Sequence, residues 1–154
     1  MKEIKAPNTF PSHWKEIPWP KYLFLAGSIE MGSAEKWQEK AVRLLKDTDW
    51  IILNPRRDDW DASWIQNKDN AQFRQQVEWE LDGLEMADKI LLYFDRATMS
   101  PISLLELGLF GWLKKEKMIV VCPDGFWKKG NVDIVCERYG IPQAETLEEA
   151  IKLL

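Results

Sequence analysis

The amino-acid sequence predicts an α/β protein with a single doubly wound parallel sheet of about five strands and helices on both faces. Short apolar runs such as 22–26 and 89–94 alternate with segments whose apolar residues have helical spacing. Runs without polar alternation are typical of strands buried on both faces. Strands that alternate with helices form parallel sheets through right-handed crossovers, as in flavodoxin-like and Rossmann-like folds.

The elements follow one another at regular intervals after residue 20. We expect strands at 22–26, 50–53, 89–94 and 118–121, and helices at 33–46, 70–87, from 101 onward, at 132–138 and at 146–154. Gly32 or Ser33 can cap the first helix, and Ser100 followed by Pro101 can begin the third. Residues 1–20 contain four prolines and are predicted to form an extended arm that lies across the domain of 21–154 or across a neighbouring subunit.

Composition excludes several classes of protein. The net charge of -4 argues against a partner that is a nucleic acid polymer, because phosphate neutralisation needs a basic surface. Two cysteines and one histidine, His13, provide neither a metal-binding pattern nor a plausible Ser-His-Asp triad. No apolar run reaches the roughly 20 residues of a membrane span, and the N-terminus lacks the features of a signal peptide, so we expect no membrane association and a cytoplasmic location.

The long loop at 56–69 is rich in charged residues and tryptophan. Asp58 or Asp59 can hydrogen-bond the edge of a planar base, and Trp60 or Trp64 can stack on it. A solvated loop held in place by tryptophan is an equally good interpretation. The nine tryptophans of the chain are most simply explained as core and subunit-interface residues.

Glu106 is the most unusual residue of the sequence. Ligands of doubly wound sheets bind at the carboxyl ends of strands, so the loops 27–29 and 95–101 are predicted to form the site. Glu106 lies just beyond them, in a helix that is apolar on nearly every side, and an unpaired buried charge costs several kcal/mol. The alternative is a capping box from Ser103 to Glu106.

A second carboxylate is predicted to approach from the preceding helix. Of the acidic residues between 78 and 85, Glu80 lies three residues after Val77 and shares its face with Leu84, which points toward the sheet. The cleavage of glycosidic bonds uses two carboxyl groups, one as the nucleophile and one as the acid. The sequence therefore favours Glu106 and Glu80 as a catalytic pair.

Three segments resemble the nucleoside 2-deoxyribosyltransferase family and the related deoxynucleoside-monophosphate N-glycosidases. They are Phe24-Leu25-Ala26-Gly27-Ser28-Ile29, Leu84-Glu85-Met86-Ala87-Asp88, and Ser100-Pro101-Ile102 leading to Glu106-Leu107-Gly108. The resemblance implies a cofactor-free base exchange in which Glu106 forms a covalent 2-deoxyribosyl ester and Glu80 is the general acid and base. It also implies that deoxynucleosides and free nucleobases are the ligands. Phe24, Gly27 and Ser28 would bind the substrate, and Asn131 of a neighbouring subunit would reach the sugar, which requires a dimer, tetramer or hexamer.

Two positions depart from the transferase pattern. The family usually has a tyrosine where this chain has Phe24, and the transferases tend to have an aspartate where it has Ser100. A serine there is typical of the monophosphate N-glycosidases, and a helix N-terminus favours an anion. Asn131 is more typical of an enzyme that acts on nucleosides. Both activities therefore remain open, and a non-catalytic nucleotide sensor is a third alternative.

Overall fold

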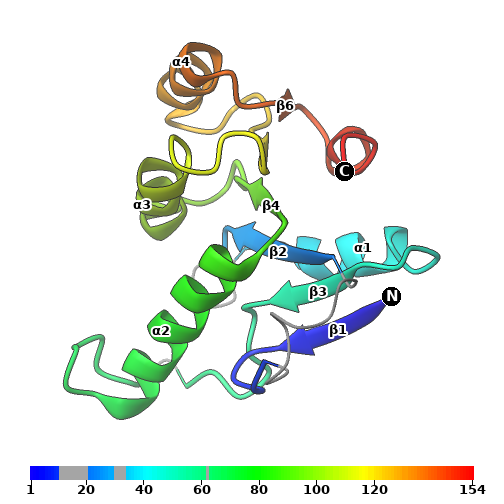
Figure 1. Cartoon of the computed structure of the whole chain (residues 1–154). Helices are drawn as coiled ribbons and strands as arrows, with labels where there is room; N and C mark the ends of the chain where they lie inside the picture. The colour runs from blue at the N-terminus through cyan, green and yellow to red at the C-terminus, as the bar shows by residue number, and fades with distance from the viewer. Residues whose placement is uncertain (11–20, 30–33, 62) are drawn as a thin grey trace.

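The structure is a computed structural model of the chain, and it describes residues 1–10, 21–29, 34–61 and 63–154. The described part contains one parallel sheet of six strands in the order β1-β3-β2-β4-β5-β6 (Figure 1). The strands are β1 (Lys2–Lys5), β2 (Tyr22–Gly27), β3 (Ile51–Asn54), β4 (Lys89–Tyr93), β5 (Met118–Val121) and β6 (Gln143–Ala144). The parallel α/β fold predicted from the sequence is confirmed.

Helices cover both faces of this sheet. One face carries α2 (Ala71–Met86), α3 (Pro101–Phe110) and α4 (Lys129–Tyr139), and the other carries α1 (Trp37–Leu44) and α5 (Leu147–Ile151) (Figure 1). The chain runs from β2 outward to β3 and then returns past β2 to β4, so the strand order reverses between β2 and β4. Such a reversal leaves a crevice at the carboxyl ends of the strands, where ligands bind.

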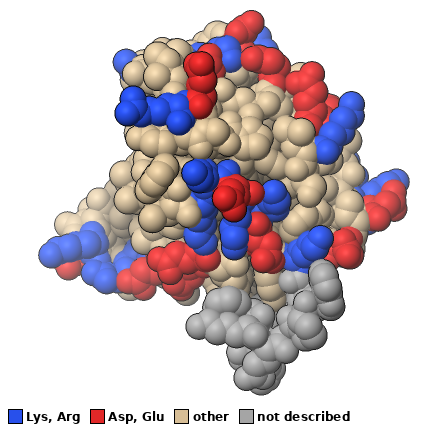
Figure 2. Space-filling model, turned by 45° about the horizontal axis from the view of Figure 1, so that its top comes forward, with Lys and Arg blue, Asp and Glu red and all other residues tan. Residues whose placement is uncertain are grey.

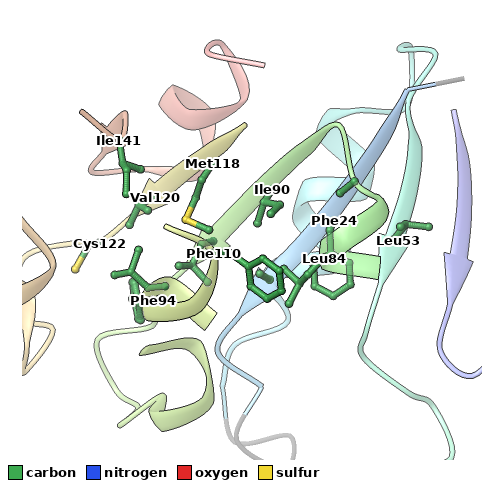
Figure 3. Packing of buried hydrophobic residues seen from close by; sticks show 14 of the residues in the cluster. Phe24, Leu53, Leu84, Ile90, Phe94, Phe110, Met118, Val120, Cys122 and Ile141 are labelled. Carbon is green, nitrogen blue, oxygen red and sulfur yellow. The ribbon is translucent and has the colours of Figure 1, made fainter. Parts of the chain in front are cut away.

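The strands supply side chains to two apolar layers. Phe24 and Ile90 belong to the layer under α2 to α4, whereas Leu23 and Leu91 belong to the layer under α1 and α5. Figure 3 shows Leu84 of α2 packed against the first layer. These five side chains are fully buried, which explains why the strands have continuous apolar sequences rather than alternating ones.

The first residues join the sheet, as a strand beyond the four that were located in the sequence. β1 pairs in parallel with β3, and Asn54 Nδ2 donates to Glu3 Oε1 at 2.7 Å. Only Ile4 of this strand is buried, so its sequence lacks the apolar run of an internal strand. Residues 11–20 of the predicted arm, with His13, lie outside the described residues, as does the predicted helix cap at 32–33.

Charged side chains of both signs are mixed on one face of the molecule. On this face, drawn in Figure 2, lysine and arginine are interspersed with aspartate and glutamate, without one broad positive field. The chain has a net charge of -4, and this face does not show the basic stripe that binds a nucleic acid backbone. In the part of the chain that the structure describes, no helix is long and apolar enough to span a bilayer.

Candidate active site

A cavity of about 790 Å³ opens at the carboxyl ends of β2 and β3, between α2 and α3. This volume lies within the range of pockets that hold small molecules. Its wall combines residues from three regions: Gly27, Ser28 and Ile29 after β2; Pro55, Arg56, Arg57, Asp58, Trp60 and Gln66 after β3; and Gln76, Glu80, Ser100, Ser103 and Glu106 among those of α2, α3 and the turn before α3. The cavity is at the edge of the sheet that the sequence predicted.

Glu106 lies in the middle of α3 and is only 8% exposed. The helix begins at Pro101, so Ser103 is already inside it and the alternative of a capping box at Ser103 is wrong. Burial raises the pKa of the Glu106 carboxyl well above its ordinary value, and the like charge of Glu80 raises it further. The two carboxyl groups therefore interact across the cavity that both of them line.

Glu80 is half-buried on α2 and is held by a side chain that the sequence analysis did not single out. Gln76 Nε2 donates to Glu80 Oε1 and to the carbonyl oxygen of Pro55, both at 2.8 Å. Burial raises the pKa of Glu80 to about 7, and the hydrogen bond from Gln76 opposes this only in part. Gln76 precedes Glu80 by four residues, and that helical spacing is the signal that could have identified it.

Three hydroxyl groups join the loop after β2 to the turn before α3. Thr98 Oγ1 lies 3.1 Å from Ser28 Oγ and 2.7 Å from Ser100 Oγ, and Ser28 Oγ accepts a hydrogen bond from the backbone N–H of Asp95 at 2.8 Å. Ser28 and Ser100 also contact each other directly. These contacts fix the wall of the cavity at the N-terminus of α3.

Ser100 occupies the predicted N-cap position but does not cap α3 with its side chain. Its backbone is left-handed, with φ 47°, whereas a capping residue normally has extended backbone. The hydroxyl bonds to Ser28 and Thr98 instead. A left-handed serine is uncommon, and the contacts of this hydroxyl offset the strain of the turn.

Gly27 allows β2 to end against β4. Its φ is 136°, and a Cβ atom at this position would lie 2.2 Å from the backbone oxygen of Tyr93. Because any side chain would clash there, the backbone can approach closely only as glycine. Ser28 follows directly, and its N–H donates to the Tyr93 oxygen at 2.9 Å.

The loop after β3 is organised by Arg57. Its Nε and Nη2 donate to the two carboxylate oxygens of Asp59 at 2.9 and 3.0 Å, and its guanidinium carbon lies 5.0 Å from the centroid of a ring of Trp64. Trp60 packs edge-on against Trp64 with ring centroids 5.2 Å apart. Trp60 and Arg57 line the cavity, whereas Asp59 is exposed and does not.

A family model described as "nucleoside 2-deoxyribosyltransferase like" matches residues 20–126 of the sequence. The chain belongs to this family. The match spans β2 to the loop after β5 and includes both Glu80 and Glu106. No curated protein was found to match the chain.

Within this deoxyribosyltransferase-like domain, three of the predicted substrate-binding residues do not line the cavity: Asp59, as described above, Phe24 and Asn131. Phe24 is fully buried in the sheet beneath α2, with its ring centroid 6.1 Å from that of Trp79, and it does not line the cavity. Asn131 is exposed on α4, beyond the matched region, and its predicted contact involves a neighbouring subunit. In the described residues, no three histidine, cysteine, aspartate or glutamate side chains are grouped to hold a metal ion.

Proposed function

We propose that the protein cleaves the N-glycosidic bond of a 2′-deoxynucleoside and transfers the deoxyribosyl group to another base. The observation that carries this proposal is the pair of enclosed carboxyl groups, Glu106 and Glu80, in one cavity of a deoxyribosyltransferase-like fold. Chemistry at an anomeric carbon uses two such groups in different roles. Glu106 is the nucleophile, and Glu80 is the general acid and base.

In the first step, a carboxylate oxygen of Glu106 attacks C1′ while the bond from C1′ to the base nitrogen breaks. Glu80 donates its proton to the departing base, which takes the electron pair of the broken bond. The product is a 2-deoxyribosyl ester on Glu106. In the second step, a new base loses a proton to Glu80 and attacks C1′, which releases the Glu106 carboxylate.

The electrostatics of the pair suit these roles. A pKa of about 7 lets Glu80 both give and take a proton near neutral pH. Burial and, to a smaller extent, the like charge of Glu80 raise the pKa of Glu106, so the two carboxyl groups do not titrate independently. Positive charge that develops on the sugar favours the ionised form of the carboxyl group facing it, and this group is Glu106.

The cavity also has separate surfaces for base and sugar. Phe73, Val77, Leu81 and Trp60 provide an apolar wall beside Glu80, which suits a planar base. Ser28 and Ser100 line the cavity near the N-terminus of α3, where hydroxyl groups can bind the 5′ end of the sugar. The proposed reaction uses no cofactor.

The test compares Glu106→Gln with wild-type enzyme in base exchange and by intact-protein mass. We expect base exchange to fall by at least about a thousandfold, as for loss of other catalytic nucleophiles. Wild-type protein incubated with a deoxynucleoside alone gains one deoxyribosyl unit, and the variant does not. Glu78→Gln, an exposed carboxyl group of α2, is the control and retains activity. Ligand binding without turnover in both proteins would instead identify a nucleotide sensor and refute the proposal.

Hydrolysis of deoxynucleoside monophosphates is the second candidate function. The hydroxyl cluster of Ser28, Thr98 and Ser100 at the start of α3 favours it, because hydroxyl groups and a helix N-terminus bind phosphate. Assays of a deoxynucleoside and its monophosphate, each with and without an acceptor base, separate the two functions. A hydrolase requires the 5′-phosphate and does not need the acceptor.

We also propose that the active form is a homo-oligomer. The side chains of one face of α3 and of the turn after it are apolar and about half or more exposed: Ile102, Leu105, Leu109, Trp112 and Leu113. A second copy of the chain would cover this face and could supply Asn131 to the sugar. Light scattering should give a mass of at least twice 18.1 kDa, and Leu113→Glu should reduce it. A wild-type monomer that is fully active would refute this.

The cytoplasmic location stays a prediction.

A further inference from the structure

Arg57 presents a buried hydrogen-bond donor for which the described residues provide no acceptor. Its side chain is only 5% exposed, and Nη1 has no partner among the described residues. The other edge of the guanidinium is fixed by Asp59, and its flat face lies over Trp64. The orientation of Nη1 is therefore set before any ligand binds, which lowers the entropy that binding must overcome.

Two further residues that line the cavity, Trp60 and Gln76, each have a buried polar atom without a hydrogen-bond partner among the described residues. Trp60 Nε1 is a buried donor without a partner among the described residues, and Trp60 packs on the same indole, Trp64, that supports Arg57. Gln76 Oε1 is a buried acceptor that receives no hydrogen bond from the described residues, although Gln76 Nε2 makes two hydrogen bonds. Buried polar atoms are nearly always paired in proteins, so three unpaired atoms on residues that line one cavity point to a ligand that pairs them.

The proposed mechanism assigns these atoms to the part of the cavity that binds the base. Gln76 holds Glu80, and Glu80 in the proposed mechanism gives its proton to the departing base. Arg57 and Trp60 belong to the loop whose first residue, Pro55, accepts from the same Gln76. The hydroxyl cluster that suits the 5′ end of the sugar belongs instead to the loop after β2 and the turn before α3.

We propose that Arg57, Trp60 and Gln76 recognise the base, and that the site prefers a base with a lactam edge, in which an exocyclic oxygen lies next to a ring N–H. This inference rests on the proposed function. The two lone pairs of the oxygen accept from Arg57 Nη1 and Trp60 Nε1, and the ring N–H donates to Gln76 Oε1. A base with an exocyclic amino group next to an unprotonated ring nitrogen has the reverse polarity and leaves buried donors facing a donor.

The experiment compares substrates that differ at this edge. Deoxyinosine and deoxyuridine have the lactam, whereas deoxyadenosine and deoxycytidine have the amino group. We expect kcat/KM for deoxyinosine to exceed that for deoxyadenosine by at least about tenfold, the discrimination typical of a base contact. In the same way, kcat/KM for deoxyuridine should exceed that for deoxycytidine. If the enzyme requires the 5′-phosphate, the corresponding monophosphates are used.

Two variants assign the preference to the named atoms. Arg57→Met and Trp60→Phe each remove one donor while keeping much of the packing volume, and each should reduce the lactam preference by at least about fivefold. Arg74→Met is the control, because Arg74 is exposed on α2, pairs with Glu78 and does not line the cavity. General damage to the fold lowers kcat/KM for both substrates equally and leaves their ratio unchanged.

The outcomes separate this inference from the proposed function. Turnover without a lactam preference, or a preference that both variants retain, overturns the inference and leaves the function intact. No base release and no adduct on Glu106 with any of the substrates overturns both. A preference for the amino-substituted bases also overturns the inference, whatever the variants do.

Discussion

The raised pKa of Glu80 makes a quantitative prediction about stability. Replacing Glu80 with glutamine removes the titrating group but keeps an oxygen that can accept the hydrogen bond from Gln76 Nε2. In the folded protein, burial raises the pKa of Glu80 from 4.5 to about 7. The folded state therefore binds the proton more tightly than the unfolded state does, and the wild-type protein loses stability as this carboxyl group ionises.

The sign and size of the effect follow from this difference. The contribution of Glu80 to the free energy of unfolding is fully present below about pH 4. It decreases as the pH rises toward 7 and is constant above that. One pKa unit corresponds to about 1.4 kcal/mol, so the wild-type protein loses up to about 3 kcal/mol over this interval. The glutamine variant should match the wild-type protein near pH 4 and exceed its free energy of unfolding by up to about 3 kcal/mol near pH 8. Relief of the repulsion on Glu106 acts in the same direction.

Urea unfolding at a series of pH values, at one fixed protein concentration, measures this difference. Glu78→Gln is the matched control, because Glu78 is exposed on the same helix and makes only a surface pair with Arg74. Its effect should remain below about 1 kcal/mol at every pH. A difference between Glu80→Gln and wild type that does not change with pH, or that is largest at acidic pH, would refute the reasoning from burial.

Other predictions concern the scaffold. Gly27→Ala should lower the free energy of unfolding by at least about 2 kcal/mol, because the new Cβ atom meets the backbone oxygen of Tyr93; an unchanged urea midpoint would contradict this. Leu84→Ala should cost about 2–5 kcal/mol by the same measurement, since the side chain is fully buried under α2. Burial raises the pKa of both Cys122 and Cys136 to about 12, so a thiol reagent near pH 8 should react only after denaturant is added. Rapid labelling of the native protein would show that the thiols are accessible.

The central strands could be predicted from the sequence because burial on both faces requires continuous runs of apolar residues. Every residue of β5 and most residues of β2 and β4 are buried, so the buried parts of their sequences are continuously apolar. The outer strands, β1 and β6, have no such apolar run. β1 has one buried apolar residue, Ile4, and β6 has only two residues, so their place in the sheet depends on pairing with neighbours that are distant along the chain.

The two carboxyl groups proposed as the catalytic pair could also be singled out from the sequence, whereas the contacts that hold the site together could not. A carboxyl group among leucines is anomalous in any fold, and this anomaly identified Glu106. Gln76 is not anomalous, because polar residues are common on helices, and only the structure reveals its bonds to Glu80 and Pro55. Ser100 was placed correctly at the helix start, but its left-handed backbone depends on hydroxyl contacts across the site.

The loop after β3 illustrates how such contacts can reverse a chemical interpretation. The sequence Arg-Arg-Asp-Asp allows two interpretations, a solvated loop or an aspartate that contacts the base, and a carboxylate binds bases that present donors. In the structure the Asp59 carboxylate is occupied by Arg57, and that of Asp58 by Lys5 of β1 at 2.9 Å. Under the inference proposed above, the charged group of this loop that meets the base is therefore Arg57, which binds acceptors. Because Lys5 lies on an edge strand that the sequence did not predict, the chemistry of the pocket depends on the least predictable part of the sheet.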